Sequence, residues 1–436
     1  MEAHINRSGH FRRVGERARR VVKQLGPGLI AGAADDDPSG IATYTQAGAK
    51  YGYGLLWTLV LTLPLMIAIQ LVSARIGWFT RRGIAANLRA HFPRPAVYSV
   101  VGLLGVANTF NLGADLGMMA EVMRLLVGKG SYHLYLAGFA VLSLALVVWL
   151  PFHRYAPVLK FLTLSLLSYA GVVLLVGVPW DALAVGALVP KLRWDRDLVL
   201  TVAAVLGTTI SPYLFFWQAS QEAEEQTARD LSRDAVHSTS DAKHLRRIRL
   251  DTALGMTFSI GVAMTVMVGA AATLYGAHGQ DISSASQAAQ ALRPIAGNFA
   301  FALFSIGIIG AGLLAVPVLA GSFAYAFADA MDWRASLADK PEAARAFYGV
   351  LAGAFLVGVM LDFNDTDPVR ELFWAAILNG IISAPIMAAL MLIAQRTSIM
   401  GPNVIGTRMR VAGWLAVALM AAVTFVLLGT AITDRT

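Results

Sequence analysis

The chain has 436 residues, of which 57% are hydrophobic and only 14% are charged, and its formal net charge is +8. Soluble domains carry nearer a quarter charged residues, because their surfaces face water. Here the charges are clustered, which leaves apolar stretches such as 294–328 and 372–395 that can cross a bilayer as helices. These features predict an all-α membrane protein, and the membrane explains the positive charge better than nucleic acid does. The chain has no cysteine, so a thiolate metal site is excluded.

Taken in chain order, the apolar segments predict about eleven membrane spans: 28–48, 54–77, 97–126, 133–152, 157–180, 198–221, 251–276, 296–328, 346–362, 370–395 and 410–432. With the N-terminus placed inside, 26 of the 35 Lys and Arg residues fall on the cytoplasmic side. This asymmetry follows the positive-inside rule, so we expect a cytoplasmic N-terminus and a C-terminus on the outside. The basic segment 1–27 has no apolar core, which predicts a cytoplasmic tail and not a cleavable signal peptide.

Two connections have compositions of their own. The segment 222–249 is dense in charges of both signs, so we predict a solvated cytoplasmic connector in which Glu222, Glu224 and Glu225 face solvent. The segment 281–295 is predicted to form a short amphipathic helix on the outside.

The first span is interrupted in its middle by three aspartates followed by Pro38, Ser39 and Gly40. Pro38 has no amide donor and disfavours helical geometry at the residue before it, and Gly40 weakens the helix further. A carboxylate at bilayer depth is unfavourable unless it faces water, a partner or an ion. We therefore predict two half-helices that meet around Asp37, with unwound backbone facing a cavity. A surface loop over 28–48 is the less favoured alternative.

The sixth span is interrupted in the same way by Gly207, Thr208, Thr209, Ser211 and Pro212. An ordinary proline kink is the alternative interpretation of this segment. The two interruptions lie five spans apart, where an inverted repeat of five plus five spans places equivalent helices. Such paired interruptions are typical of transporters whose site lies at the membrane midplane.

These considerations divide the chain into four parts. We expect a basic tail at 1–27, a first repeat at 28–180, a second repeat at 198–395 and an eleventh span at 410–432.

The breaks are predicted to attract a cation. Unwound carbonyls and the C-terminal ends of half-helices are electronegative, and Asp37 adds a full negative charge. Thr208 and Ser211 add further oxygen atoms, and neither break contains His, Cys or Met. Oxygen ligands suit Mg²⁺, Mn²⁺ and Ca²⁺ better than softer metals. Asp35 and Asp36 are expected to line the approach and attract cations electrostatically.

The motifs at the two breaks resemble those of the NRAMP family of divalent-metal transporters, which have a LeuT-type fold. DPSG (37–40) is similar to the family's Asp-Pro-Gly-Asn, and GPG (26–28) is similar to its lead-in. TTISPYL (208–214) resembles the sixth-helix motif Ala-Thr-Val-Met-Pro-His-Asn in its position and its proline. The resemblance covers about residues 24–432. It implies a secondary transporter in the bacterial plasma membrane, and not an enzyme.

The departures from the family pattern concern the metal ligands. The family binds metal through the Asp and Asn of the first motif and the Ala carbonyl and Met sulfur of the sixth. Asp37 is retained, Gly40 offers no side chain in place of Asn, Thr208 keeps the carbonyl, and Ser211 removes the sulfur. The pattern resembles the bacterial NRAMP-related magnesium transporters, and smaller side chains leave room for a partly hydrated Mg²⁺. The resemblance thus implies metal ligands at Asp37, Gly40, Thr208 and Ser211, with secondary candidates at Asp35, Asp36, Thr209, Asp115 and Asn379.

This sequence lacks several of the titratable residues that form the proton path in the family. Asp115 matches the third-helix Asp, but Met118 stands at the Glu position, and Tyr213 replaces the sixth-helix His. We therefore expect import of Mg²⁺, and of Mn²⁺, by alternating access without proton coupling. The first alternative is a proton-coupled Mn²⁺/Fe²⁺ symporter of the usual family type, and the second is a LeuT-fold transporter of an organic substrate. Asp115 is equally well explained as a helix-end residue satisfied by water.

Other assignments follow from the same site. Asn108, Asn111 and Asn379 are expected to bond between helices, although Asn379 could also reach the ion. The predicted partners are the divalent ion and the lipid bilayer, with no resident cofactor and no nucleic acid. One chain supplies the whole site, so a monomer suffices for transport, and dimer formation stays open. The eight His residues show no His-Glu-x-x-His spacing, which argues against a membrane-embedded hydrolase.

Overall fold

The computed structural model describes residues 26–149, 168–175, 177–190, 195–231, 241–275, 285–337, 340–362 and 368–433. All regular secondary structure in these residues is helical, as the interior of a bilayer requires, because a helix satisfies its own backbone hydrogen bonds. The elements are α2 (Pro27–Asp35), α3 (Pro38–Tyr51), η1 (Gly52–Leu55), α4 (Leu56–Thr80), α5 (Ile84–His91), α6 (Arg94–Val127), α7 (Tyr132–Trp149), α9 (Ser168–Leu175), α10 (Trp180–Leu188), α11 (Arg196–Thr209), α12 (Pro212–Leu231), α13 (Asp241–Leu274), α14 (Ala285–Met331), α15 (Arg345–Asp362), α16 (Pro368–Gln395), α17 (Thr397–Met400), η4 (Gly401–Asn403) and α18 (Thr407–Thr433).

Nine helical segments of the described chain are long and apolar enough to cross a membrane. They differ from the eleven predicted spans in two places. The first is Pro38–Thr80, where α3 and α4 join through η1 into one segment, while α2 is too short to count alone. The second is the predicted fifth span, 157–180, of which only 168–175 and 177–180 are described. The predicted basic tail lies outside the described residues, except for Gly26 and Pro27.

The predicted interruption of the first span is a break between two half-helices. α2 ends at Asp35 and α3 begins at Pro38. Asp37 is the N-cap of α3, and its carboxylate accepts the backbone N–H of Gly40 at 2.7 Å. Pro38 occupies the first helical position, where the missing amide hydrogen costs nothing.

The predicted interruption of the sixth span is also a break. α11 ends at Thr209 and α12 begins at Pro212, so Ile210 and Ser211 form the unwound link. The carbonyl of Ile210 accepts a hydrogen bond from Ser383 Oγ of α16 at 2.7 Å. A neighbouring helix therefore supplies the donor that this link lacks.

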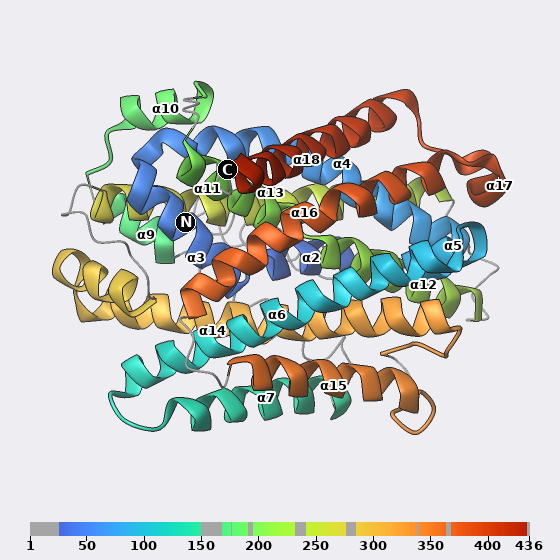
Figure 1. Ribbon diagram of the computed structural model, residues 1–436, viewed down its shortest axis with the longest axis horizontal. Helices are drawn as coiled ribbons and strands as arrows, with labels where there is room; N and C mark the ends of the chain where they lie inside the picture. The colour runs from blue at the N-terminus through green and yellow to red at the C-terminus, as the bar shows by residue number, and fades with distance from the viewer. Residues whose placement is uncertain are drawn as a thin grey trace, which may run out of the picture.

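The broken helices lie in the interior of the helix bundle. α13 packs along α2 and α3, and α16 packs against α11 and α18. α6 packs against both α14 and α16. Figure 1 shows α7 and α15 side by side along the lower edge, next to α6 and α14, so these two helices form the periphery.

α2 approaches α13 at a distance that requires glycine. A Cβ atom added to Gly28 would lie 2.7 Å from the backbone nitrogen of Thr252, and one added to Gly32 would overlap the backbone of Gly255. Small residues at these positions let the two backbones touch, as is common between membrane helices.

A buried carboxylate caps the start of α2. Asp251 of α13 is 2% exposed. It accepts hydrogen bonds from the N–H groups of Gly26 at 2.9 Å, Gly28 at 2.8 Å and Leu29 at 3.1 Å. These amides belong to the first turn, where a helix has no partners of its own, and the helix dipole favours a negative charge there. The cap therefore ties the first half-helix to α13.

Two predicted connections are wrong in part. Residues 285–295 do not form a separate helix but begin α14, which runs on to Met331, because ASQAAQALR is rich in strong helix formers. The segment 222–249 is helical at both borders, since α12 continues to Leu231 and α13 begins at Asp241. Residues 232–240 lie outside the described part of the chain.

The prediction that Glu222 faces solvent is wrong, because its side chain on α12 is 0% exposed. Its carboxylate lies 3.5 Å from His244 Nε2 and 3.7 Å from an Arg247 nitrogen, and Glu225 pairs with the same Arg247 at 2.6 Å. Glu224 accepts a hydrogen bond from Tyr325 at 2.8 Å. The packing of α13 and α14 on α12 covers Glu222 completely and Glu224 and Glu225 in part, which their positions in the sequence do not reveal.

We expect Asp251→Ala to destabilise the fold, because three amides at the start of α2 lose their acceptor. The loss should be about 2–4 kcal/mol in unfolding free energy, given roughly 1–3 kcal/mol for each buried group left unpaired and partial relaxation. Denaturant unfolding in detergent, followed by tryptophan fluorescence, measures it. The control is Asp197→Ala, which removes an exposed ion pair with Lys50 and should cost less than about 1 kcal/mol. A loss equal to that of the control would contradict the capping role.

Candidate metal site

Asp37 lies at the centre of the first break and is 1% exposed. Its Oδ1 atom accepts hydrogen bonds from Ser39 Oγ and the Gly40 N–H, each at 2.7 Å. Its Oδ2 atom accepts from Asn111 Nδ2 at 3.0 Å and from the Tyr213 hydroxyl at 3.3 Å. Donors from α3, α6 and α12 thus hold one carboxylate. The Tyr213 hydroxyl has one hydrogen and also lies 2.8 Å from the Ala34 carbonyl, so its bond to Oδ2 is the weakest of the four and the first that an arriving ion would replace.

Thr208 and Ser211 approach each other at the second break. Ser211 Oγ donates to the Thr208 carbonyl at 2.7 Å and lies 3.3 Å from the Gly207 carbonyl. Two oxygens bound side by side to a small divalent ion, each at about 2.1 Å, would lie roughly 3 Å apart. The Thr208 carbonyl and the Ser211 hydroxyl therefore have a spacing close to that of neighbouring ligands.

The two breaks are in direct contact. Ser39 Oγ lies 3.3 Å from Thr208 Oγ1, and the Tyr213 hydroxyl donates to the Ala34 carbonyl near the end of α2 at 2.8 Å. A Cβ atom added to Gly40 would lie 3.4 Å from Thr208 Oγ1. The structure thus brings together the four positions predicted for the metal site, which are Asp37, Gly40, Thr208 and Ser211.

Asp35 and Asp36 are buried beside the break and face α13. Ser259 Oγ donates to Asp35 Oδ2 at 2.6 Å and lies 3.3 Å from Asp36 Oδ1. In the described part of the chain, no Lys or Arg side chain contacts either carboxylate. Both residues place further carboxyl groups close to Asp37, and these attract cations when they are ionised.

Asp115 lies in the interior of α6 and is 0% exposed, so its interpretation as a solvated helix-end residue is wrong. Its Oδ1 atom accepts the backbone N–H of Ser39 at 3.2 Å. α6 continues for about three more turns after Asp115, so this residue is not at the helix end. The structure thus places a second titratable carboxylate directly against the first break.

The remaining secondary candidates differ in their surroundings. Thr209 Oγ1 lies 3.1 Å from the Tyr44 hydroxyl and donates to the Val205 carbonyl at 2.6 Å. Asn379 is 1% exposed, and neither of its side-chain polar atoms has a hydrogen-bond partner among the described residues. The bond between helices expected for Asn379 is therefore not seen in this part of the chain.

Three residues that sequence reasoning did not place among the ligands contact Asp37, namely Ser39, Asn111 and Tyr213. Ser39 and Tyr213 lie inside the two motifs, so their contact with Asp37 could have been predicted from their positions in the sequence. Asn111 lies on α6, and only helix packing brings it to the break. The sequence feature that pointed to Asn111 was a polar amide within an apolar span, one turn before Asp115. Asn108, on the same helix, instead donates to the Leu319 carbonyl at 3.0 Å and to Ser322 Oγ at 2.8 Å.

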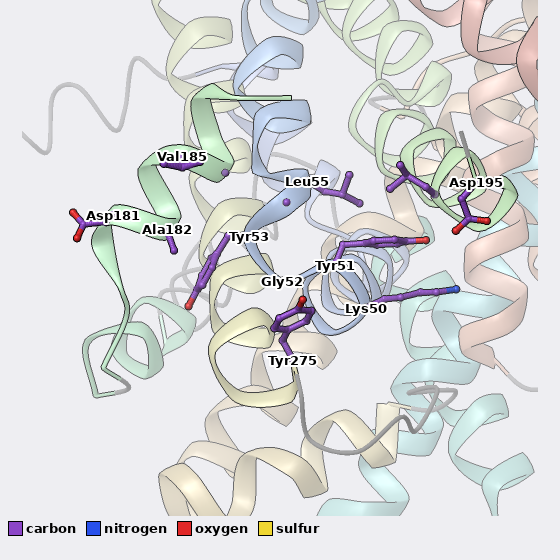
Figure 2. A pocket seen from close by; sticks show the side chains of 13 residues that line it. Lys50, Tyr51, Gly52, Tyr53, Leu55, Asp181, Ala182, Val185, Asp195 and Tyr275 are labelled. Carbon is purple, nitrogen blue, oxygen red and sulfur yellow. The ribbon is translucent and has the colours of Figure 1, made fainter. Parts of the chain in front are cut away.

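The site is closed at both ends, since Asp37, Thr208 and Ser211 are at most 2% exposed. A cavity of about 950 Å³ opens beyond the end of α3, where Tyr51, Tyr53, Tyr275, Asp181 and Asp195 are among its lining residues (Figure 2). A cavity of about 400 Å³ lies at the opposite end, beside the end of α4 and the middle of α12. Neither of these two cavities is lined by a residue of the site.

The site offers one close carboxylate surrounded by neutral oxygen atoms. Among the described residues, no group of three or more His, Cys, Asp or Glu is arranged to hold a metal ion. Hydroxyl and carbonyl oxygens, or water, must therefore complete the ligand set around Asp37. Such a set suits hard divalent cations, and Mg²⁺ in particular usually keeps several waters.

Comparison with known proteins gives consistent results. The profile of the family described as "Natural resistance-associated macrophage protein-like" matches residues 28–430. The divalent metal cation transporter MntH of Pectobacterium carotovorum subsp. carotovorum is 31% identical over 314 residues, which cover 69% of this chain and 71% of that protein.

Two solved structures show the fold. A mutant of the Eremococcus coleocola manganese transporter has a TM-score of 0.74 at 16% identity and covers 94% of this chain and 86% of that one. Mhp1, a nucleobase-cation-symport-1 family transporter in a closed conformation, has a TM-score of 0.51 at 16% identity, with 93% of each chain covered. The predicted LeuT-type fold with broken first and sixth helices is confirmed.

We expect Asp37→Ala to weaken the binding of Mn²⁺ and Mg²⁺ by at least about tenfold, because it removes the carboxylate between the two breaks. Isothermal titration of the purified protein in detergent measures this change. Asp35→Ala is the matched control, since it removes a buried carboxylate that bonds to α13, and its effect should be smaller. Equal affinity in wild type and Asp37→Ala would remove Asp37 from the site.

Proposed function

Because the chain belongs to the Nramp family, we propose that it carries a divalent metal cation across the membrane and binds the ion between its two helix breaks. Its named relatives are transporters, and the chain is a transporter and not an enzyme. The observation that carries the proposal is the contact between the breaks at Asp37, Ser39, Thr208 and Ser211. Oxygen atoms from both halves of the chain converge there.

The helix ends reinforce the charge of Asp37. α2 and α11 both point their C-terminal ends at the site, and such ends carry roughly half a negative charge. Residues 28–180 and 198–395 are assigned as the two repeats, each contributing one broken helix. One chain supplies every residue of this site, so a monomer suffices. The burial of the site fits the occluded stage of alternating access, in which import moves the ion towards the side of the N-terminus.

Mn²⁺ is the first candidate cargo. The structural neighbour from Eremococcus coleocola is named as a manganese transporter, and the relative from Pectobacterium as a divalent metal cation transporter. Carboxylate, carbonyl and water ligands suit Mn²⁺. In this form the protein is a proton-coupled symporter of the usual family type, with Asp115 as the titratable group that α6 contributes at the first break.

Mg²⁺ without proton coupling is the second candidate, and a specific observation favours it. Ser211 supplies a hydroxyl at the position where the family pattern has a sulfur, so the site contains hard ligands throughout. Uncoupled import is energetically sufficient. Two charges that cross about 100 mV gain roughly 4.6 kcal/mol, which sustains inward flow against a concentration ratio on the order of a thousandfold.

We expect Ser211→Met combined with Gly40→Asn to shift binding towards Cd²⁺ relative to Mg²⁺, by about tenfold or more in the ratio of dissociation constants. The substitutions add a thioether and an amide to a set of hard ligands. Competition titrations on the purified protein measure the ratio. Ser143→Met, on the peripheral helix α7, is the control for an added buried methionine. A ratio that stays at the wild-type value would place positions 40 and 211 outside the ligand set.

Proteoliposome uptake separates the two candidates, with an internal pH dye and a clamped membrane potential. The loss of titratable groups at Met118 and Tyr213 predicts Mg²⁺ and Mn²⁺ uptake without metal-dependent acidification. Acidification that accompanies Mn²⁺ uptake and disappears in Asp115→Asn would instead establish the symporter. Asp362→Asn, which removes a buried carboxylate on the peripheral helix α15, controls for the loss of a carboxylate. Failure of wild type to take up either ion would contradict divalent-metal transport itself.

A further inference from the structure

Asn111 contributes an amide to the site from outside both breaks. It lies in the interior of α6 and is 0% exposed. Its Nδ2 atom donates to Asp37 Oδ2 at 3.0 Å. A carboxylate accepts hydrogen bonds, so the NH₂ group of the amide must face Asp37.

The other half of this amide is unpaired. The Oδ1 atom of Asn111 is buried and has no hydrogen-bond partner among the described residues. A buried acceptor without a partner is unfavourable, and natural structures rarely keep one without a use. In Asn111 this atom belongs to the same planar group as the Nδ2 that touches Asp37, so it lies beside the carboxylate.

An ion arriving at Asp37 changes what Asn111 can do. The polar groups around Asp37 are donors, and a cation at Oδ2 competes with the Asn111 amide, because the single hydrogen of the Tyr213 hydroxyl is shared with the nearer Ala34 carbonyl. An asparagine can rotate its amide and present oxygen in place of NH₂. The same side chain can thus hold the carboxylate before the ion binds and coordinate the ion afterwards.

The first break itself offers no such ligand. Gly40 has no side chain, although its position faces Thr208 and its N–H bonds to Asp37. An amide oxygen is a hard ligand of the kind that Mg²⁺ and Mn²⁺ accept.

We propose that Asn111 is a direct ligand of the transported ion, donating to Asp37 in one state and coordinating the metal through Oδ1 in the other. This inference rests on the proposed function and extends its ligand set to α6. It also links α6 to the bound ion. In the metal-free state Asn111 of α6 contacts Asp37 directly, and in the metal-bound state the two side chains are connected through the ion.

A spectroscopic test exploits the absence of native cysteine. In Asn111→Cys, Cd²⁺ should bind the introduced thiolate and produce a thiolate-to-cadmium charge-transfer band in the ultraviolet. The band should saturate at one Cd²⁺ per chain and disappear when Asp37→Ala is added. Asn108→Cys is the matched control, because the Asn108 amide points at Leu319 and Ser322 and should give no band. A band absent from Asn111→Cys, in protein that binds Cd²⁺, would overturn the proposal.

An affinity test separates coordination from a purely structural role. Asn111→Leu, which is nearly isosteric, should raise the Mn²⁺ and Mg²⁺ dissociation constants by about tenfold or more. Adding Gly40→Asn supplies an amide beside Asp37 and should restore binding to within about threefold of wild type. A structural role predicts no such rescue, so a defect that Gly40→Asn leaves in place overturns direct coordination, as does unchanged affinity in Asn111→Leu.

Failure of the inference is distinguishable from failure of the proposed function. Wild-type protein that binds and transports the metal while both Asn111 tests fail removes only Asn111 from the ligand set. Wild-type protein that binds no divalent ion overturns both. If Asn111→Leu does not fold, the Asn111→Cys spectrum decides.

Discussion

The Asp37 carboxylate in the middle of the helix bundle is the constraint on which the site depends. In a low-dielectric interior, such a group persists only where donors or a cation surround it. The break after α2 supplies two donors locally, from Ser39 and Gly40. The other two, Asn111 and Tyr213, come from α6 and α12 and meet Asp37 only when those helices pack correctly. The packing of α6 and α12 that stabilises Asp37 is therefore the same packing that assembles the site.

The same constraint explains how a half-helix of nine residues is held. A helix this short is not stable alone, and its first amides and last carbonyls lack partners. α2 receives partners at both ends, from Asp251 at its start and from Tyr213 at the Ala34 carbonyl. Between them, Gly28 and Gly32 let the backbone lie directly on α13. The half-helix is therefore held by polar contacts at both ends and by close packing on α13 along its length.

In the described part of the chain, the carboxyl groups in the interior have no basic side chain beside them. Asp35, Asp36, Asp37 and Asp115 are all at most 1% exposed, and among the described residues their contacts are hydroxyl, amide and backbone N–H groups. At the end of the bundle where α12 and α13 meet, Arg247 instead pairs with two carboxylates. Arg229 adds a second basic partner for Glu225, so carboxylates at the bundle end are paired within the protein, whereas those at the centre are left to a mobile cation.

The sequence by itself determined the membrane class, most span positions and both helix breaks, because hydropathy and the Pro and Gly residues act locally along the chain. It also singled out Asp37 and Ser211, which lie inside the breaks, and Thr208, which lies in the last turn of α11. Only the tertiary structure decided that Asn111 touches Asp37, that Asp115 abuts Ser39 and that Glu222 is buried. Each of these facts depends on which helices pack together and on their rotation about their axes. Helical periodicity cannot specify such contacts in spans that are apolar on every side.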